Sequence, residues 1–259
     1  MKVFPYKQQF LTPGWGGSRR SDRGIILPEA GCGFTLIELL VVISIIAILL
    51  SIMMPALNRA RGMAKRTVCL SNMRQMGLTV QEYLMDSDDH LPPTSHVGDP
   101  EKYWLRVLAK YSKQTLLFRC PADKADNFVD WTRPLNSQPA DLRYSSYAVN
   151  YLLDPQCTRY YIGPKYDRVS NVRKPDYCIW VSEAPTNSTF TRSEHIHPES
   201  WEGAVDYAKL FIAWNRHLGT SNYLFVDGHA ENLIFEDTYA WPTPCYWYPE
   251  SAPAWPANP

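Results

Sequence analysis

The chain has 259 residues and a formal net charge of zero, with 26 basic and 26 acidic residues. This length suits one small-to-medium domain with attachments, because domains typically hold about 100 to 200 residues. The balanced charge argues against a nucleic-acid-binding protein, which usually clusters Lys and Arg on one surface. The nine Trp, 16 Tyr and 21 Pro favour a loop-rich extracellular domain, although core packing and turns account for the same residues.

Residues 34–54 form an apolar run that is long enough to cross a membrane, since about 20 residues suffice. Glu38 is the only ionisable residue in this run. A carboxylate at this depth costs roughly 2.5 to 3.5 kcal/mol on insertion scales, so it needs a partner. The run is too long for the apolar part of a secretory signal peptide, and small residues precede it instead of following it. We therefore expect a membrane-spanning helix with a functional acid near its start, and an acid that snorkels from an ordinary anchor is the lesser alternative.

The stretch Gly33-Phe34-Thr35-Leu36-Ile37-Glu38 resembles the processing site of type IV prepilins and type II secretion pseudopilins. The resemblance implies that a prepilin peptidase cleaves between Gly33 and Phe34 and methylates the new Phe34 amine, so that residues 1–33 are a leader. It also implies that Glu38 pairs with the freed amine of a neighbouring subunit in a filament. Basic residues flank the run on both sides, so an orientation with the leader in the cytoplasm follows from the resemblance alone.

The apolar pattern continues beyond Pro55, where a proline should kink or locally melt a helix. Apolar residues recur every three to five positions, and polar residues lie on the opposite face. We expect one long helix over residues 34–85, with residues 34–54 in the membrane and residues 55–86 packed on a globular domain. The apolar residues are Leu57, Ala60, Ala64, Val68, Met73, Met76, Val80 and Leu84, and the opposing ones are Arg59, Arg66, Arg74 and Gln81.

The helix should end at Asp86-Ser87-Asp88-Asp89-His90, which Pro92 and Pro93 follow. Short polar residues and paired prolines predict a turn. Clustered oxygen ligands also suit Ca²⁺, but the spacing is not that of an EF-hand loop. A turn is the primary prediction, and a calcium site is the lesser alternative.

Residues 87–240 predict a β-rich globular domain, and residues 241–259, rich in Pro and Trp, predict an irregular strap over the sheet or a mobile end. Residues 103–111 predict a short helix. Asp227-Gly228 separates two strand-like runs and predicts a hairpin with a type I′ turn. The expected fold class is α+β, a long helix packed on an antiparallel sheet. The inward residues of the short helix are Trp104, Leu105 and Leu108, and the predicted strands are Tyr144–Leu152, Tyr177–Ser182, Phe211–Trp214, Asn222–Val226 and His229–Phe235.

A second resemblance covers most of the chain after the leader. His217 is followed after nine residues by Asp227-Gly228, and this stretch resembles the C-terminal H-X9-DG motif of a large pilin-like family. Residues 68–75, 118–123 and 144–150 also resemble segments of that family. The resemblance implies a pilin-like architecture and assigns no role to the motif.

Histidine and acidic residues around this motif offer a metal site as one interpretation. His217, Asp227 and His229 could bind a metal such as zinc, and His195 with His197 could add ligands. Structural hydrogen bonding is the primary interpretation, because Asp227 suits the turn and His229 opens the return strand. The sequence carries none of the common hydrolase, metalloprotease, phosphate-binding or dinucleotide motifs. We therefore predict no enzyme, no catalytic residues and no cofactor, with Ca²⁺ or zinc as the lesser alternative.

Cleavage after Gly33 would remove Cys32 and leave five cysteines. An oxidising cell exterior would permit disulfides. We favour a bridge between Cys69 and Cys120, which would tie the long helix to the loop after the short helix. A pair among the remaining cysteines is a weaker expectation, because connectivity cannot be deduced from sequence. These remaining residues are Cys157, Cys178 and Cys245.

Together these features predict a pilin-like subunit, held in the inner (cytoplasmic) membrane by a single span, with its C-terminal domain outside the cytoplasm until it assembles into a filament. Expected partners are other pilin-like subunits, a prepilin peptidase, an inner-membrane assembly platform and membrane lipid. A pilus, a secretion pseudopilus and a DNA-uptake fibre all remain open. One alternative is a membrane-anchored module that binds extracellular glycans through exposed aromatic side chains. Another is a metal-dependent hydrolase built on His195, His197, His217 and Asp227.

Overall fold

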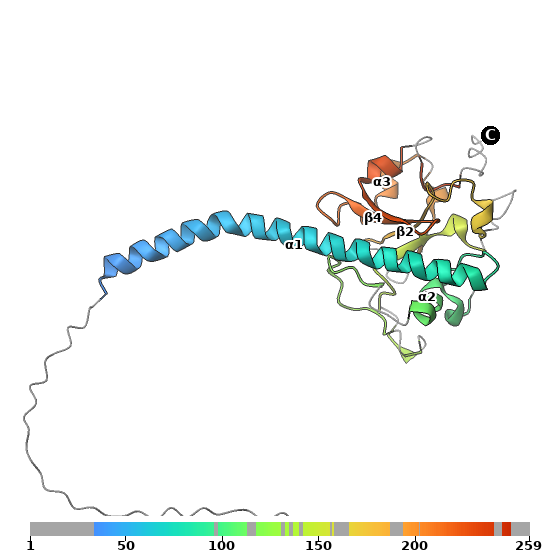
Figure 1. The fold of residues 1–259 in the computed structure, drawn as a ribbon, viewed down its shortest axis with the longest axis horizontal. Coiled ribbons are helices and arrows are strands. Elements are labelled where there is room, and N and C mark those ends of the chain that lie inside the picture. Colours follow the sequence, from blue (N-terminus) through green and yellow to red (C-terminus); the bar gives the residue numbers. More distant parts are fainter. Residues whose placement is uncertain are drawn as a thin grey trace, which may run out of the picture. The chain divides into compact units, whose positions relative to one another are not determined.

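A computed structural model describes part of the chain, shown as a ribbon in Figure 1. The chain divides into two compact units between Leu50 and Ser51. The predicted leader, residues 1–33, lies outside the described residues, as do residues 241–244 and 250–259 of the predicted tail. The described residues are 34–95, 98–112, 118–130, 133–134, 137–139, 142–155, 157, 166–186, 194–201, 203–240 and 245–249.

Helix α1 (Leu36–Asp86) contains 51 residues and confirms the single long helix predicted from sequence. It continues through Pro55 without a break, so the helix does not melt locally there, and the kink stays a prediction. The flanking turns contain strong helix formers, which keep the backbone helical although the proline ring removes one N–H donor. Within the described residues, α1 is long and apolar enough to cross a membrane.

The C-terminal part of α1 buries one face against the globular unit. The buried apolar positions follow one another at intervals of four, three, four and four residues. These intervals place them on one face of the helix. The predicted stripe is confirmed from Met73 onward, but Val68 is 51% exposed and Leu57 is also exposed. The buried face therefore begins at Cys69, beyond the first four positions of the predicted stripe, which are all exposed. Its apolar members are Cys69, Met73, Met76, Val80 and Leu84.

A five-stranded sheet with the strand order β3-β1-β2-β4-β5 forms the centre of the globular unit. Neighbouring strands are antiparallel except for β1 and β3, which are parallel. The α+β class is confirmed, and the sheet is mixed where an antiparallel one was expected. The strands are β1 (Tyr147–Asn150), β2 (Ile179–Glu183), β3 (His195–Ile196), β4 (Ser221–Phe225) and β5 (Ala230–Leu233).

The predicted strand Phe211–Trp214 is wrong, because this segment forms turns after α3. Its apolar side chains pack in the second core cluster described below, so burial produced the strand-like pattern without a strand. One backbone bond, from Ala213 N to Glu183 O at 2.7 Å, ties the segment to the end of β2. β3 was missed because two residues give no readable alternation.

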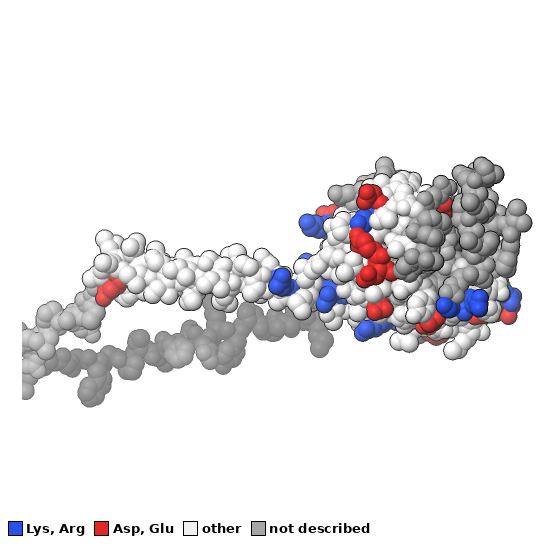
Figure 2. All heavy atoms as spheres, turned by 90° about the horizontal axis from the view of Figure 1, so that it is seen from above, with Lys and Arg blue, Asp and Glu red and all other residues white. Residues whose placement is uncertain are grey.

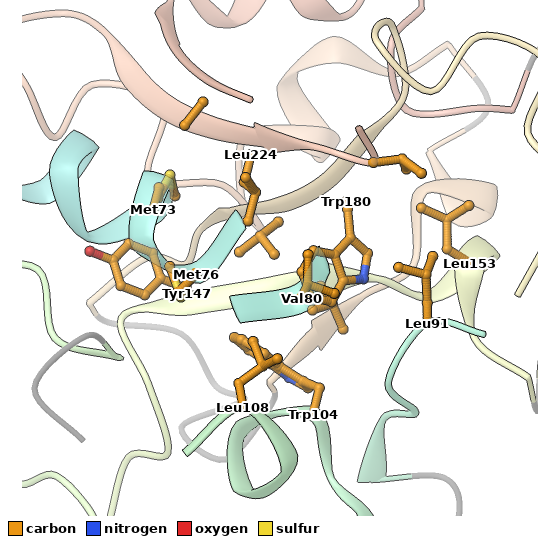
Figure 3. Close-up of a cluster of buried hydrophobic side chains, with 14 of the residues drawn as sticks. Met73, Met76, Val80, Leu91, Trp104, Leu108, Tyr147, Leu153, Trp180 and Leu224 are labelled. Carbon is orange, nitrogen blue, oxygen red and sulfur yellow. The ribbon is translucent and has the colours of Figure 1, made fainter. Parts of the chain in front are cut away.

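Both faces of the sheet are covered. One core cluster joins side chains of α1, α2 (Trp104–Ser112) and the sheet, and Figure 3 shows Met76, Val80, Trp104 and Trp180 meeting there. The predicted inward residues of α2 are all buried. A second cluster lies on alternate positions of the same strands, with Tyr223 and Phe225 of β4 in place of Leu224. Such alternation is the period-two pattern of a sheet with two buried faces.

The short elements and the tail complete the second cluster. Trp247 is fully buried there, and its backbone carbonyl accepts a hydrogen bond from Asn150 Nδ2 at 2.7 Å. Residues 245–249 therefore form an irregular strap, one of the two forms expected for the tail. The remaining elements are η2 (Pro100–Lys102), η5 (Tyr151–Leu153), η6 (Val169–Asn171), η7 (Pro198–Ser200), α3 (Val205–Ala208) and α4 (Phe235–Thr238).

The hairpin between β4 and β5 lies where Asp227-Gly228 predicted it, but its turn type differs. Gly228 has φ of +91°, whereas Asp227 is not among the positive-φ residues that a type I′ turn requires. Gly228 N donates to Phe225 O, and Phe225 N donates to His229 O. This pattern is a three-residue loop, a type I turn followed by a left-handed glycine. The single left-handed position falls on glycine, which adopts it without steric cost.

Candidate functional site

The first turn of α1 holds the acid that the sequence singled out. Thr35 N and Thr35 Oγ1 both donate to Glu38 Oε2, at 2.9 and 2.6 Å. Glu38 N in turn donates to Thr35 Oγ1 at 3.3 Å. These reciprocal bonds form a capping box, in which the residue before the helix and the third helical residue satisfy free N–H groups. Glu38 thus has a structural partner in its own chain, which the sequence analysis did not foresee.

Glu38 Oε1 has no hydrogen-bond partner among the described residues. The apolar part of α1 is white in Figure 2 except for acidic atoms at its start. Phe34, the residue predicted to become the new N-terminus, is 73% exposed, and Gly33 lies outside the described residues. An exposed carboxylate oxygen beside the predicted cleavage point can accept a second, charged donor.

A second group of polar side chains is buried in the globular unit. Cys69 of α1, Cys120 of the loop after α2, Glu183 at the end of β2 and His217 before β4 place one ligand atom each within 4.8 Å of one another. All four residues are buried, with exposures of 0 to 3%. We call them the C2EH cluster. Its members are up to 148 residues apart in sequence, and the fold brings them together through the α1–sheet contact.

Glu183 is the hub of the C2EH cluster. Its Oε1 lies 2.7 Å from both Cys69 Sγ and His217 Nε2. Its Oε2 accepts hydrogen bonds from Ser221 Oγ at 2.9 Å and Asn222 N at 3.0 Å. A fully buried carboxylate is costly unless it is paired and hydrogen-bonded, and these four contacts meet that requirement.

The two remaining members complete the ring of contacts. Cys120 Sγ lies 3.5 Å from His217 Nε2, and the Tyr147 hydroxyl lies 2.9 Å from Cys69 Sγ. Tyr147 is directly opposite Glu183 in the β1–β2 pairing, so both side chains point to the α1 face. His217 Nδ1 is buried and has no hydrogen-bond partner among the described residues.

The burial and mutual contacts of these groups shift their pKa values in opposite directions. Burial raises the pKa of the Cys69 thiol. A hydrogen bond with Cys69 outweighs burial and lowers the pKa of Cys120 to about 6. Burial opposes protonation of His217, but its contacts with Cys120 and Glu183 prevail and raise its pKa to about 9. Burial likewise disfavours the Glu183 carboxylate, yet its hydrogen bond with His217 lowers its pKa.

A buried ion-pair network lies beside the C2EH cluster. Asp123 Oδ2 is 3.2 Å from Arg143 Nη2 and 3.3 Å from Arg216 Nη2, and all three side chains are at most 5% exposed. Arg216 immediately precedes His217 in the chain. Its charge favours the ionised forms of Cys120 and Glu183. The network therefore supplies positive charge next to the acidic cluster.

The metal ligands proposed from sequence occupy different places. His217 lies in the C2EH cluster, while His229 Nδ1 bonds Asp227 Oδ1 at 2.6 Å on the hairpin turn. His195 lies in β3. Strands β1 and β2 lie between β3 and β4, so β3 and β4 are roughly 14 Å apart at about 4.8 Å per strand. His197 bonds Glu199 at 2.7 Å, and its ring lies 4.9 Å from that of His195. A hydrolase site joining His195, His197, His217 and Asp227 is therefore not formed, because the sheet holds these residues apart.

The structure brings the predicted pair Cys69 and Cys120 together as free thiols. Their disulfide thus remains an expectation, as does any pair among Cys157, Cys178 and Cys245, which are also free thiols here. Sequence reasoning missed Glu183. Its available signal was an acid at the end of an apolar strand, in the residues Ile179-Trp180-Val181-Ser182-Glu183.

The turn at the end of α1 is confirmed, since α1 ends at Asp86. Acidic side chains near this turn contact basic ones. Arg168 Nη2 contacts Asp88 Oδ2, and His90 Nδ1 lies 2.8 Å from Asp167 Oδ2. These contacts account for the polar residues without a calcium ion, which stays an untested alternative.

His217 opens a strained turn. Leu218 and Gly219 have φ of +59° and +92°, and His217 N donates to Thr220 O at 3.0 Å. Positive φ at both central residues defines the type I′ turn, which the sequence analysis had expected at Asp227-Gly228. Leucine in this conformation costs roughly 1–2 kcal/mol.

We expect Leu218→Asn to raise the free energy of unfolding by about 1 kcal/mol, because asparagine tolerates positive φ and Leu218 is 56% exposed. Chemical denaturation followed by Trp fluorescence measures the change. Leu210→Asn is the control, since Leu210 is also exposed and has no positive φ. An equal gain in both variants would contradict the strain argument.

Residues 32–54 match the family described as the prokaryotic N-terminal methylation motif. The chain carries a prepilin-type N-terminal signal. This finding supports the predicted prepilin-type signal and points to a pilin-like protein that is processed at its N-terminus. Together with the apolar length of α1, it supports a single-pass anchor in the inner membrane. No match was found among curated proteins, and none among solved structures.

Proposed function

We propose that this chain is a subunit of a type IV pilus-like or type II secretion filament, cleaved between Gly33 and Phe34 and assembled through the N-terminal part of α1. The observation that carries the proposal is the methylation motif at residues 32–54, which continues into a helix able to cross a membrane. From Cys69 to Leu84, α1 then packs on the globular unit, which stays outside the cytoplasm. Its partners are a prepilin peptidase, an assembly platform and other pilin-like subunits.

Glu38 has two tasks in this proposal. Its Oε2 caps α1 through Thr35. Its Oε1 accepts a hydrogen bond from the charged, methylated amine of Phe34 in a neighbouring subunit. A buried or lipid-facing carboxylate without such a partner is costly. The exposed apolar side chains between Leu36 and Met54 are covered first by lipid and then by neighbouring helices.

The first test is the N-terminus of the protein recovered from cells that contain a prepilin peptidase. Mass spectrometry should find a chain that begins with methylated Phe34, and Gly33→Val should abolish cleavage. Gly24→Val, in the leader but away from the site, should leave cleavage intact. Recovery of the wild-type chain with residues 1–33 still attached would refute the proposal.

A second test separates the two tasks of Glu38. Glu38→Gln keeps an acceptor for Thr35 but removes the charge, so we expect normal cleavage and loss of the chain from sheared filaments. Thr35→Ala removes the cap at a cost of about 1 kcal/mol but keeps the charge, so assembly should persist. Filaments that retain Glu38→Gln at wild-type levels would argue against charge pairing.

The glycan-binding alternative would gain support from an exposed row of Trp and Tyr beside a groove. Tyr177 and Tyr207 are exposed, but they lie on separate segments, before β2 and in α3. In the described part of the chain no Trp is exposed, and four are almost fully buried. These four, Trp104, Trp180, Trp201 and Trp247, serve the two core clusters. The filament subunit is therefore the function that the described residues support best.

A further inference from the structure

The C2EH cluster has a composition that hydrogen bonding alone does not require. It combines two thiols, a carboxylate and an imidazole in a buried space. Sulphur, nitrogen and carboxylate oxygen are the three ligand types that zinc accepts in proteins. Such a mixed set of four ligands points to zinc over Mg²⁺ or Ca²⁺, which prefer oxygen alone.

We propose that Cys69, Cys120, Glu183 and His217 bind a structural zinc ion that fastens α1 to the sheet. This site goes beyond the filament function and does not depend on it. It differs from the set expected from sequence, with which it shares only His217. All four residues belong to the unit from Ser51 onward.

Only small movements are needed to accept the ion. Ligand atoms around tetrahedral zinc stand roughly 3.3–3.8 Å apart, given bonds of about 2.0–2.3 Å. Cys120 Sγ and His217 Nε2 are 3.5 Å apart already. Glu183 Oε1 is 2.7 Å from Cys69 Sγ and from His217 Nε2, so these contacts must open by less than about 1 Å.

The surroundings hold the ligands as zinc sites require. Ser221 and Asn222 occupy Glu183 Oε2, which leaves Oε1 facing the other three ligand atoms. The Tyr147 hydroxyl contacts Cys69 Sγ and can donate to its thiolate. Outer contacts of this kind fix ligand orientation and raise metal affinity.

The local charges also balance. Two thiolates, one carboxylate and Zn²⁺ give a net charge of −1. Asp123, Arg143 and Arg216 together contribute +1 in the adjacent ion-pair network. Zinc binding would release the thiol protons to solvent and leave no uncompensated charge in the core.

The test is metal analysis of the full chain, purified in detergent without chelator or reductant. We expect roughly one zinc per chain, as in a closed four-ligand site. Cys120→Ser and His217→Gln should weaken zinc binding by more than the roughly 10–100-fold that outer contacts contribute. His229→Gln is the matched control, because His229 lies on the exposed hairpin turn, and it should keep its zinc.

Co²⁺ exchanged into the wild-type chain gives a second readout that does not depend on variants folding. Thiolate-to-cobalt charge-transfer absorption with a tetrahedral visible spectrum would support the site. A Cys69–Cys120 disulfide found by mass spectrometry of the purified chain would overturn it. Free thiols without metal, or a different metal in place of zinc, would overturn it as well.

Discussion

Replacing Gly77 with alanine is expected to lower the free energy of unfolding by about 3 kcal/mol, the upper part of the range for overpacked cores. A Cβ atom at Gly77 would lie closer than 3.0 Å to the carbonyl oxygen of Gly228, and real Cβ atoms essentially never approach so closely. The obstructing atom is backbone, so a rotamer change cannot relieve the clash. Urea denaturation of the full chain in detergent, followed by Trp fluorescence, measures the loss.

Gly62→Ala is the matched control on the same helix. A Cβ there would meet Leu218 Cδ2 at 3.2 Å, the end of an exposed and movable side chain. Alanine also favours helix over glycine by about 1 kcal/mol, so this variant should be neutral or more stable. If Gly77→Ala were as harmless as Gly62→Ala, the close contact between α1 and the hairpin turn would be refuted.

This contact explains two parts of the His217–Asp227-Gly228 pattern in physical terms. Gly228 combines a left-handed backbone with a close approach to α1, and both requirements favour glycine. Asp227 Oδ1 accepts from His229 N at 3.0 Å and so stabilises the turn. His217 lies in the C2EH cluster instead. The two parts of the pattern therefore contact α1 at two different places, near Cys69 and near Gly77.

Local patterns allowed most of the elements to be predicted. α1 follows from its apolar run and stripe, and the hairpin follows from Asp227-Gly228 between two strand-like segments. The predictions failed where tertiary contacts determine the backbone conformation. The type I′ turn lies at Leu218-Gly219, where the reciprocal backbone pairing of His217 with Thr220 outweighs the poor preference of leucine.

The C2EH cluster could not be predicted because it depends on register and long-range contact. A β-bulge between Ile179 and Val181 shifts the β2–β4 pairing, and Val181 and Glu183 then share the α1 face. A single sequence shows neither the bulge nor the partner of Glu183. Cys69 also fell outside the predicted stripe, because the stripe passed through Val68.

Replacing Asp123 with alanine should lower the free energy of unfolding by about 3–5 kcal/mol, the range for a buried ion pair that loses one partner. The change leaves Arg143 and Arg216 buried without their shared carboxylate. Thr186 Oγ1, which donates to Asp123 Oδ1 at 2.7 Å, also loses that acceptor. Asp126→Ala, an exposed acid in the same loop, should change stability by less than about 0.5 kcal/mol.

The same network predicts a pH dependence with a definite sign. Burial disfavours the Asp123 carboxylate, but the charges of Arg216 and Arg143 prevail and hold its pKa below the usual 3.8. A lowered folded-state pKa means that the stabilisation is complete above the unfolded-state pKa and is lost as pH falls through the folded one. The stability gap between the wild type and Asp123→Asn should therefore be constant from pH 7 to about pH 5 and shrink below about pH 4. Denaturation curves at several pH values measure this gap, and a gap that widens on acidification would contradict the ion-pair network.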